Sequence, residues 1–339
     1  MKFKKQGKQT VRFENPPSII ATGTIVGPKE GEGPLKNYFD IILEDDLFGE
    51  GSWEKCESKM QQEAIKNSLR KSGVALNDID YVFGGDLLNQ IIASGFAARE
   101  LQVPFFGLYG ACSTMSESLS LGAMIIDGGY AEKVICVTSS HFSTAERQFR
   151  YPLELGNQRP LTAQWTVTGS GASLLSLEGN GPFITHVTTG KIIDPGIKDT
   201  SNMGAAMAPA AADTIVTHFK DTGFSIDDYD VIATGDLGEI GKKIVLEYIK
   251  KEGLDISDIY TDCGLEIFDN NKQDTHSGGS GCGCSASVFN GYFYKQLESR
   301  KIERILLVST GALHSSTSAQ QGESIPGIAH AVSICVNKG

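Results

Sequence analysis

A long-range internal repeat constrains the fold of this chain more than any other feature of its sequence. Residues 78–87 form an apolar segment that ends in Gly-Asp-Leu, and residues 228–237 return with the same pattern. A Cys-Ser dipeptide then opens an apolar stretch in each half, at Cys112 and again at Cys284. The spacing is much longer than the roughly 20 to 50 residues of solenoid repeats, so the pattern indicates a duplicated domain.

Two further matches follow in the same order. Residues 133–141 and 304–314 are each an aliphatic run that leads to a histidine, and residues 169–174 have a counterpart in residues 327–332. Strands of this kind are typical of α/β units, so each half is expected to be one. We therefore expect an N-terminal arm (1–17), a first half (18–190) and a second half (191–339).

The segments between the expected strands have the period of helices. Apolar residues within 237–249 recur every three or four positions, and Gly253 can end this helix. A similar stripe within 60–69 ends at Gly73. Buried strands that alternate with such helices predict sheets covered on both faces, and the loops that leave the strand ends are where a site is expected.

The charge of the chain excludes some partners. There are 41 acidic and 30 basic residues, a net charge of -11, which repels nucleic acid and anionic lipid headgroups. No nucleic acid partner is expected. The basic N-terminal arm precedes no apolar segment or cleavage site, so we expect a solvated tail rather than a signal peptide. Its basic residues are Lys2, Lys4, Lys5, Lys8 and Arg12.

Hydropathy and cysteine usage suggest a soluble, intracellular protein. No apolar run approaches the ~18 residues that span a bilayer, so any membrane association is expected to be peripheral and mediated by proteins. The seven cysteines are an odd number, and some of them, such as Cys136 and Cys335, lie inside apolar stretches. A reduced thiol behaves there as a small hydrophobic group, and no disulfide scaffold is indicated.

Cys112 is the first candidate for a functional residue. Residues 105–113 predict a strand that enters a tight turn, and Thr114 with Glu117 has the spacing of a capping box for the helix that follows. Cys112 then lies at a helix N-terminus, where the macrodipole lowers a thiol pKa and also offers a place for a carboxylate. The alternative is a packed cysteine with no further role.

These segments resemble the thiolase and ketoacyl synthase superfamily over most of the chain. The first half is similar to its nucleophile elbow and later Gly-Ala-rich strand, and residues 281–288 resemble the Gly-Asn-Thr-Ser-Ser-Ala-Ser region of the type III synthases. The resemblance implies a thiolase-like fold, with duplicated α/β halves in a layered αβαβα arrangement. The matching first-half segments are 111–113, 122–129, 133–139 and 168–172.

The resemblance also implies which catalytic groups to look for, and here they differ. Condensation in the type III synthases uses a cysteine thiolate with a histidine and an asparagine. This chain has Thr-Gly-Asp-Leu at 234–237 in place of the family's His-Gln-Ala-Asn, and Cys282 where the asparagine would be. An acidic Asp236 near a thiol raises its pKa. We therefore expect no catalytic residues, with an active acyl-transfer enzyme as the alternative.

Three histidines are candidate ligand donors. His276 lies in a segment that distantly resembles the Gly-His-Pro loop of thiolases, while His141 and His314 follow equivalent strands. Each can donate a hydrogen bond to an anion without any nucleophile, or can be an ordinary loop histidine. The glycine-rich run 278–283 lacks the ending of a phosphate loop, and Cys282-x-Cys284 has no second ligand pair. Neither a metal nor a cofactor is expected.

Within the superfamily, the whole chain most resembles the stage V sporulation protein AD family. The segments that carry this likeness are 23–31, 48–55 and 310–315. It implies a protein of the spore, peripherally associated with the inner spore membrane, that works with the membrane subunits of the SpoVA system. It also implies direct binding of dipicolinic acid, alone or chelated with Ca2+, as this acid enters the developing spore and leaves it at germination.

A former acyl pocket that lacks its catalytic partners can hold such a ligand. Dipicolinate is a small flat dianion, and amides, hydroxyls and histidines near Cys112 could hold its carboxylates between apolar walls. A scaffold for membrane partners is a further alternative, and a homodimer is left open. The expected ligand-binding residues are Cys112, Ser139, Ser140, His141, Asp236, His276, Gly278, Cys282 and His314.

Overall fold

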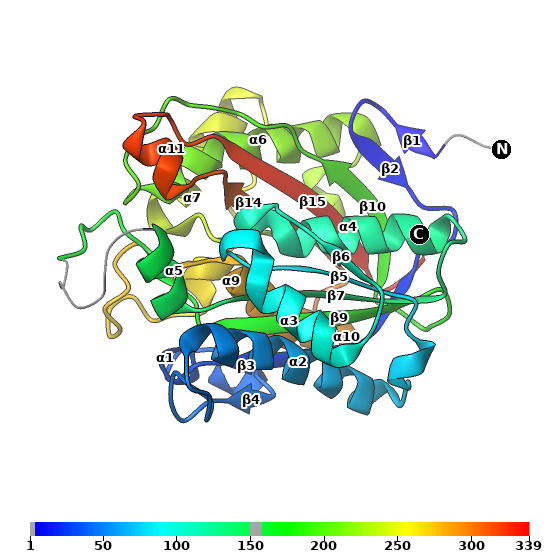
Figure 1. Ribbon diagram of the computed structural model, residues 1–339. Coiled ribbons are helices and arrows are strands. Elements are labelled where there is room, and N and C mark those ends of the chain that lie inside the picture. The colour runs from blue at the N-terminus through cyan, green and yellow to red at the C-terminus, as the bar shows by residue number, and fades with distance from the viewer. Residues whose placement is uncertain (1–3, 150–157, 339) are drawn as a thin grey trace.

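The computed structural model describes residues 4–149 and 158–338, which form two runs of five strands joined edge to edge (Figure 1). One antiparallel residue pair, Phe183 with Ser18, connects the runs. In spatial order, the first run contains β3 (Ser18–Val26), β9 (Gly169–Ser176), β7 (Lys133–Ser140), β5 (Tyr81–Gly85) and β6 (Phe105–Gly107). The second contains β10 (Phe183–Thr189), β15 (Gly327–Cys335), β14 (Arg304–Ala312), β11 (Val231–Thr234) and β12 (Tyr260–Asp262).

The repeated segments occupy equivalent positions in the two runs. The pairs β5 and β11, β7 and β14, and β9 and β15 each have the same rank in their own run. The duplicated α/β fold that the sequence predicts is therefore confirmed. The boundary near residue 190 stays a prediction, since β10 pairs with β15 and so lies in the second run.

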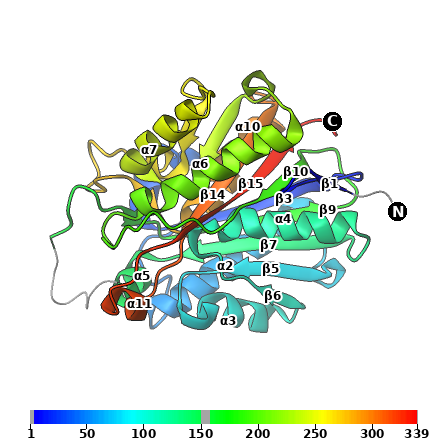
Figure 2. The same ribbon diagram turned by 90° about the horizontal axis from the view of Figure 1, so that it is seen from above.

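Helices cover the outer faces of both runs of strands and also fill the space between the two runs. In Figures 1 and 2, α2 (Trp53–Ser72) and α3 (Ile92–Leu101) lie on one outer side, and α6 (Met203–Thr222) and α7 (Gly238–Lys251) on the other. Between the two runs of strands lie α4 (Thr114–Asp127) and α9 (Cys282–Val288). They join the two halves, because α4 of the first half contacts β14 of the second half as well as β7, while α9 of the second half contacts β9 and β7 of the first. The layer order is αβαβα, as the sequence predicts.

The remaining elements are short. A π-helical segment (Phe289–Phe293) continues α9 into α10 (Tyr294–Glu298). Among residues 4–149 and 158–338, no helix is both long enough and apolar enough to cross a bilayer. The other helices are α1 (Pro28–Gly31), α5 (Phe142–Phe149), α8 (Cys263–Glu266) and α11 (Ser316–Gln320), and the other strands are β1 (Lys5–Gln6), β2 (Thr10–Arg12), β4 (Ile41–Ile42), β8 (Trp165–Thr166) and β13 (Gly279–Ser280).

Two predicted helix ends are confirmed and one predicted cap is wrong. Gly73 and Gly253 follow α2 and α7 with φ of 71° and 85°, the left-handed backbone that ends a helix. The capping box of Thr114 and Glu117 does not form, because the helix begins at Thr114 itself, one residue earlier than a box with Thr114 as its N-cap requires. The Thr114 hydroxyl instead donates to the carbonyl of Ala111, at 2.6 Å.

The N-terminal arm is part of the sheet, so the prediction of a solvated tail is wrong for the described residues of the arm. The strands β1 and β2 form a hairpin, and β2 pairs with β10. The Asp221 carboxylate accepts three backbone N–H groups from residues 8–10 at 2.9 to 3.1 Å. The hairpin thereby covers a sheet edge whose backbone groups need partners. Lys2 lies outside the described residues.

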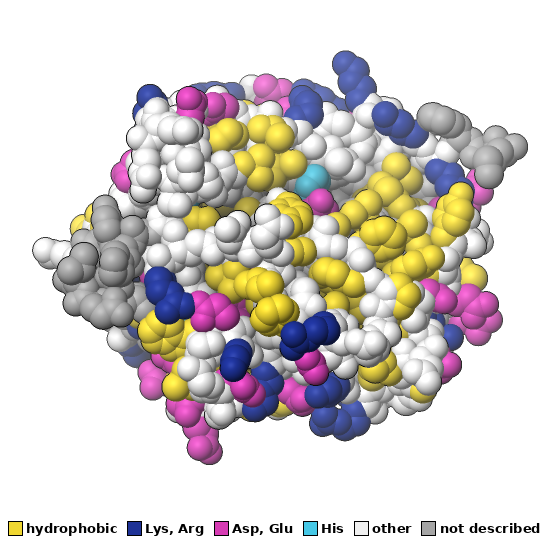
Figure 3. Space-filling model, in the orientation of Figure 1, with side chains coloured by type: hydrophobic (Ala, Val, Ile, Leu, Met, Phe, Trp, Pro, Cys, Tyr) yellow, Lys and Arg dark blue, Asp and Glu magenta, His cyan; other side chains and the backbone are white. Residues whose placement is uncertain are grey.

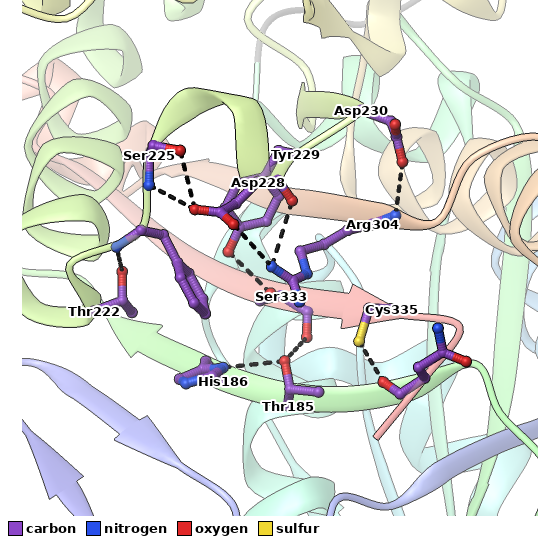
Figure 4. A network of polar contacts seen from close by, with 12 residues as sticks. Thr185, His186, Thr222, Ser225, Asp228, Tyr229, Asp230, Arg304, Ser333 and Cys335 are labelled. Carbon is purple, nitrogen blue, oxygen red and sulfur yellow. Dashed lines mark hydrogen bonds and ion pairs between the residues drawn. The ribbon is translucent and has the colours of Figure 1, made fainter. Parts of the chain in front are cut away.

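A network of polar contacts joins β10, β15 and the turn before β11, and Figure 4 shows Thr185, His186, Tyr229 and Ser333 in it. The Tyr229 hydroxyl donates to the Ser333 hydroxyl at 2.9 Å, and Nε2 of His218 lies 2.6 Å from the Tyr229 oxygen. Nδ1 of His186 lies 3.0 Å from the hydroxyl of Thr185. Burial lowers the pKa of His186 to about 4 and that of His218 to about 3. Both imidazoles are therefore neutral in the folded protein near pH 7.

The buried His218 predicts a specific pH dependence of stability. Its pKa is lowered in the folded state, so the unfolded chain alone binds this proton below about pH 6.5, and stability is lost as the pH falls toward 5. His218→Gln is expected to be less stable than wild type at pH 7. The difference in the free energy of unfolding between wild type and this variant, measured with urea, should shrink by about 2 kcal/mol at pH 5. The reason is that only in wild type does the unfolded chain gain a proton at position 218. A gap that is the same at both pH values would contradict the assignment.

Candidate functional site

A cavity of about 510 Å3 lies where the two halves meet. Asp86 follows β5, Cys112 lies just beyond β6, and Ala312 ends β14, so its walls come from the carboxyl ends of strands. This is the place that the α/β architecture predicts for a site. Besides these three, the lining residues are Leu87 to Ile91, Tyr109, Ala111, Ala145, Gln148, Phe149, Thr166, Met203, Met207, Ser280, Leu313, His314, Ser315 and Ser318.

Cys112 is held at the base of this cavity by a tight turn. The turn Ala111–Ser113 precedes α4, and Ala111 has a left-handed backbone with φ of 49°. The Ser113 hydroxyl donates to the carbonyl of Gly110 at 2.6 Å and closes the turn. A β-carbon at Gly311 would lie 2.4 Å from that same carbonyl oxygen, so glycine allows β14 to approach.

Asp236 lies directly beside the thiol. One carboxylate oxygen accepts from the Thr310 hydroxyl at 2.6 Å, and the other accepts from the Gly281 N–H at 2.9 Å and the Ser280 hydroxyl at 3.2 Å. The Cys112 thiol lies beside this carboxylate and interacts with it. Burial raises the pKa of Asp236 to about 6, and the Thr310 and Gly281 hydrogen bonds limit the rise.

The environment of Cys112 keeps its thiol protonated. Burial raises the pKa of Cys112 well above its ordinary value, and the Asp236 carboxylate raises it further. The lowering expected from the start of α4 is therefore outweighed. Thiolate chemistry needs the opposite arrangement, in which a positive or donor group stabilises the charged sulfur.

The turn that carries Asp236 is fixed by a second buried carboxylate. Asp262 accepts from the N–H groups of Leu237 and Gly238, at 2.8 and 2.9 Å. The Gln164 side chain donates to the carbonyl of Asp236 at 2.6 Å. These hydrogen bonds hold Asp236 in place without a basic side chain.

Asp86 occupies the equivalent position in the first half. Its carboxylate accepts from the Leu88 N–H at 2.8 Å and from the Ser94 hydroxyl at 2.6 Å. Glu57 lies near it, and burial followed by the Asp86 charge raises the pKa of Glu57 to about 8. The sequence prediction omitted Asp86, although the repeated Gly-Asp-Leu pattern marks it as the counterpart of Asp236.

The structure brings only part of the predicted set to the cavity. Cys112 and His314 line it, and the His314 ring centroid lies 5.7 Å from that of Phe149. Ser139 and Ser140 are fully buried beneath it. Their hydroxyls donate to the Glu57 carboxylate at 3.0 Å and to the Val167 carbonyl at 2.7 Å, respectively.

His141 and Cys282 are used inside the protein. Nε2 of His141 lies 2.9 Å from the carbonyl oxygen of Asp46, and its Nδ1 accepts the Ser143 N–H at 3.1 Å. Burial lowers the pKa of His141, which favours the neutral ring. The Cys282 thiol donates to the carbonyl of Ser139 at 2.8 Å. Neither side chain is among the described residues that line the cavity.

His276 lines a second cavity, of about 520 Å3, on a different part of the surface. Its Nε2 lies 2.9 Å from the Asp274 carboxylate, and its Nδ1 lies 2.8 Å from the Pro160 carbonyl oxygen. Gly278 has φ of 113°, which favours glycine, and its carbonyl accepts the Trp165 N–H at 2.8 Å. These two predicted residues lie apart from Cys112.

Apolar residues that the sequence prediction omitted form much of the cavity wall. Met203 and Met207 are four positions apart on α6 and face the cavity together with Tyr109 and Phe149. No described lining residue is lysine or arginine. Within the described parts of the chain, no group of three or more His, Cys, Asp or Glu side chains is arranged to hold a metal ion.

The pH dependence of alkylation tests the state of Cys112. We expect iodoacetamide to label it slowly at pH 7 and faster only in alkaline solution, since the thiol is buried and lies beside a carboxylate. Asp236→Asn should move the profile to lower pH by about one unit, the effect of removing one nearby negative charge. Peptide mass spectrometry measures each cysteine separately. Cys56 is the internal control, because its labelling profile should be the same in wild type and in Asp236→Asn. Fast labelling of Cys112 in wild type at pH 7 would contradict the assignment of a protonated thiol.

Comparison with known proteins agrees with the fold and names a family. The stage V sporulation protein AD (SpoVAD) family matches residues 7–335. The stage V sporulation protein AD of Bacillus subtilis (strain 168) is 46% identical over 330 residues, which cover 97% of each chain.

Solved structures of condensing enzymes share the fold. The 3-oxoacyl-[acyl-carrier-protein] synthase III of Aquifex aeolicus VF5 has a TM-score of 0.58 at 10% identity, over 94% of this chain and 99% of that one. Cerulenin-bound OleA of Xanthomonas campestris has a TM-score of 0.61 at 15% identity, over 95% and 98%. At these identities the similarity supports the thiolase-like fold alone.

Proposed function

The chain belongs to the stage V sporulation protein AD (SpoVAD) family, and from this premise we propose that it binds dipicolinic acid without catalysing a reaction on it. The ligand occupies the Cys112 cavity, as the free acid anion or as its calcium chelate. The buried Asp236 carboxylate, which lies beside the Cys112 thiol and holds the Gly281 N–H and the Thr310 hydroxyl, carries the non-catalytic part of this proposal.

The thiol cannot act as a nucleophile in this setting. The donors around Asp236, namely the Gly281 N–H and the Thr310 hydroxyl, already hold a fixed carboxylate. An oxyanion formed during acyl transfer would have to compete with that carboxylate for them. Because the nucleophile and the anion-stabilising donors are both engaged, binding is favoured over acyl transfer.

The cavity suits a small flat aromatic acid. Its volume of about 510 Å3 lies within the usual range of small-molecule sites. Met203, Met207 and Phe149 provide apolar walls for a ring, while Ser280 and His314 provide polar groups near its edge. Such a site, with apolar walls and few polar groups, is typical of small-ligand recognition.

Charge favours the calcium chelate among the forms of this ligand. The described lining contains the carboxylate of Asp86 but no lysine or arginine, so a dianion gains no ion pair there. Calcium cancels the charge of the two ligand carboxylates and can accept further oxygen ligands.

We also propose that the protein works with the membrane subunits of the SpoVA system at the inner spore membrane, in both uptake and release of the ligand. In Figure 3, hydrophobic side chains gather on the face that carries α3 and β6 in Figure 1. Exposed apolar patches of this kind are typical of protein contacts. Their exposed residues are Ile92, Phe96, Phe106 and Tyr109. A homodimer stays a prediction, which light scattering can test.

Calorimetry with pyridine-2,6-dicarboxylate tests the binding proposal. We expect saturable binding to wild type, and an affinity at least about tenfold lower in Met203→Trp, because the larger side chain fills the cavity. His276→Ala is the matched control, since His276 lines the second cavity, and it should bind as wild type does. Thermal melts confirm that both variants are folded.

Two other outcomes would contradict the proposal. Heat with acyl-coenzyme A but not with pyridine-2,6-dicarboxylate would indicate an acyl-transfer enzyme. Binding of neither compound, together with co-purification of membrane proteins, would indicate a scaffold.

A further inference from the structure

Two carboxyl groups from equivalent positions in the two halves flank the cavity. Asp86 lines it directly, while Asp236 accepts a hydrogen bond from the hydroxyl of the lining residue Ser280 and lies beside the lining residue Cys112. The side chains of both aspartates are almost fully buried, at 4% and 0% exposed. An anion that enters the cavity therefore approaches two acidic groups in a poorly solvated space, where charges interact strongly.

No positive charge offsets these carboxyls within the described residues. Within the described residues, the groups that donate to Asp236 and Asp86 are neutral N–H and O–H groups. Within the cavity itself, His314 is the imidazole that lines the wall. The titratable groups that face Asp236 are Cys112, Asp262, Cys263, Cys282 and Cys284, and those that face Asp86 are Glu57 and Cys282.

Asp236 and an incoming ligand need the same donors. Ser280 and Cys112 both line the cavity, where the Ser280 hydroxyl donates to the Asp236 carboxylate at 3.2 Å and the Cys112 thiol lies beside it. While Asp236 is ionised, it holds them. A proton on Asp236 removes the negative charge and turns an acceptor oxygen into a donor, so that Ser280 and Cys112 can turn to the ligand.

We propose that the Cys112 cavity takes up one proton together with an anionic ligand, and that Asp236 is the group that receives it. The buffer acid in the solvent gives up the proton, so its bond to hydrogen breaks as an O–H bond forms on the Asp236 carboxylate, and no covalent bond to the ligand is made. This inference rests on the proposed function, because it requires an anionic ligand in this cavity.

The raised pKa of Asp236 supports this coupling between ligand binding and proton uptake. Burial raises its pKa to about 6, so without ligand it is mostly ionised at pH 7.5. A ligand anion nearby raises the pKa further and draws in a proton. The wall that carries Asp86 differs. The pKa of Glu57 is raised to about 8, so the Glu57 and Asp86 pair already holds a proton before the ligand binds. Asp86→Asn is therefore a matched control for Asp236→Asn.

Calorimetry in two buffers measures the proton directly. The intact protein is titrated with pyridine-2,6-dicarboxylate at pH 7.5 in phosphate and in Tris, which differ in ionisation enthalpy. The difference in heat reports the protons taken up on binding. We expect about one proton for wild type and for Asp86→Asn, and a dissociation constant that rises about tenfold per pH unit above pH 7. In Asp236→Asn, proton uptake and this pH dependence should both be lost while binding persists.

The calcium chelate of the same ligand is the second control, since it carries no net charge, and it should bind with little proton uptake. Equal wild-type heats in the two buffers, with clear binding, would overturn the inference and leave the proposed function intact. Equal proton uptake by the free anion and the chelate would overturn it too, and this comparison needs no variant to fold. Absence of binding in any buffer would reject the proposed function and the inference with it.

Discussion

The buried Asp236 carboxylate is the group on which the rest of this site depends. It is held by the Gly281 N–H and the Thr310 hydroxyl, and the Cys112 thiol lies beside it. This carboxylate raises the pKa of the thiol and occupies donors that an oxyanion would need. Asp262 holds the turn that carries Asp236 in place.

Close backbone packing between the halves maintains the cavity above this carboxylate. A β-carbon at Gly171 would lie 2.3 Å from the Ala286 carbonyl oxygen, and one at Gly311 would lie 2.4 Å from that of Gly110. Glycine at these positions lets α9 and the Cys112 turn lie against the opposite half. The cavity is thus a feature of the duplication itself, since each half supplies one wall and one buried aspartate.

The fold could be predicted from the sequence because the repeat consists of apolar segments, and their pattern follows directly from burial in the sheet. The sequence also placed Asp236 near Cys112. Side-chain direction was harder to predict, since His141 and His276 follow the expected strands and loops yet contact Asp46 and Asp274 instead of the cavity. Those contacts depend on distant segments that no local pattern reveals. The partner of the N-terminal hairpin, more than 200 residues away in sequence, is a similar case.

Exposure of the protein to acetyl-coenzyme A, followed by intact-protein mass spectrometry, shows whether Cys112 can form a thioester. We expect an unchanged mass for wild type at pH 7 to 8, because the thiol next to Asp236 stays protonated and finds no vacant oxyanion donors. An acetyl adduct that maps to Cys112 would contradict it, since such a thioester requires the thiolate that the neighbouring carboxylate should suppress.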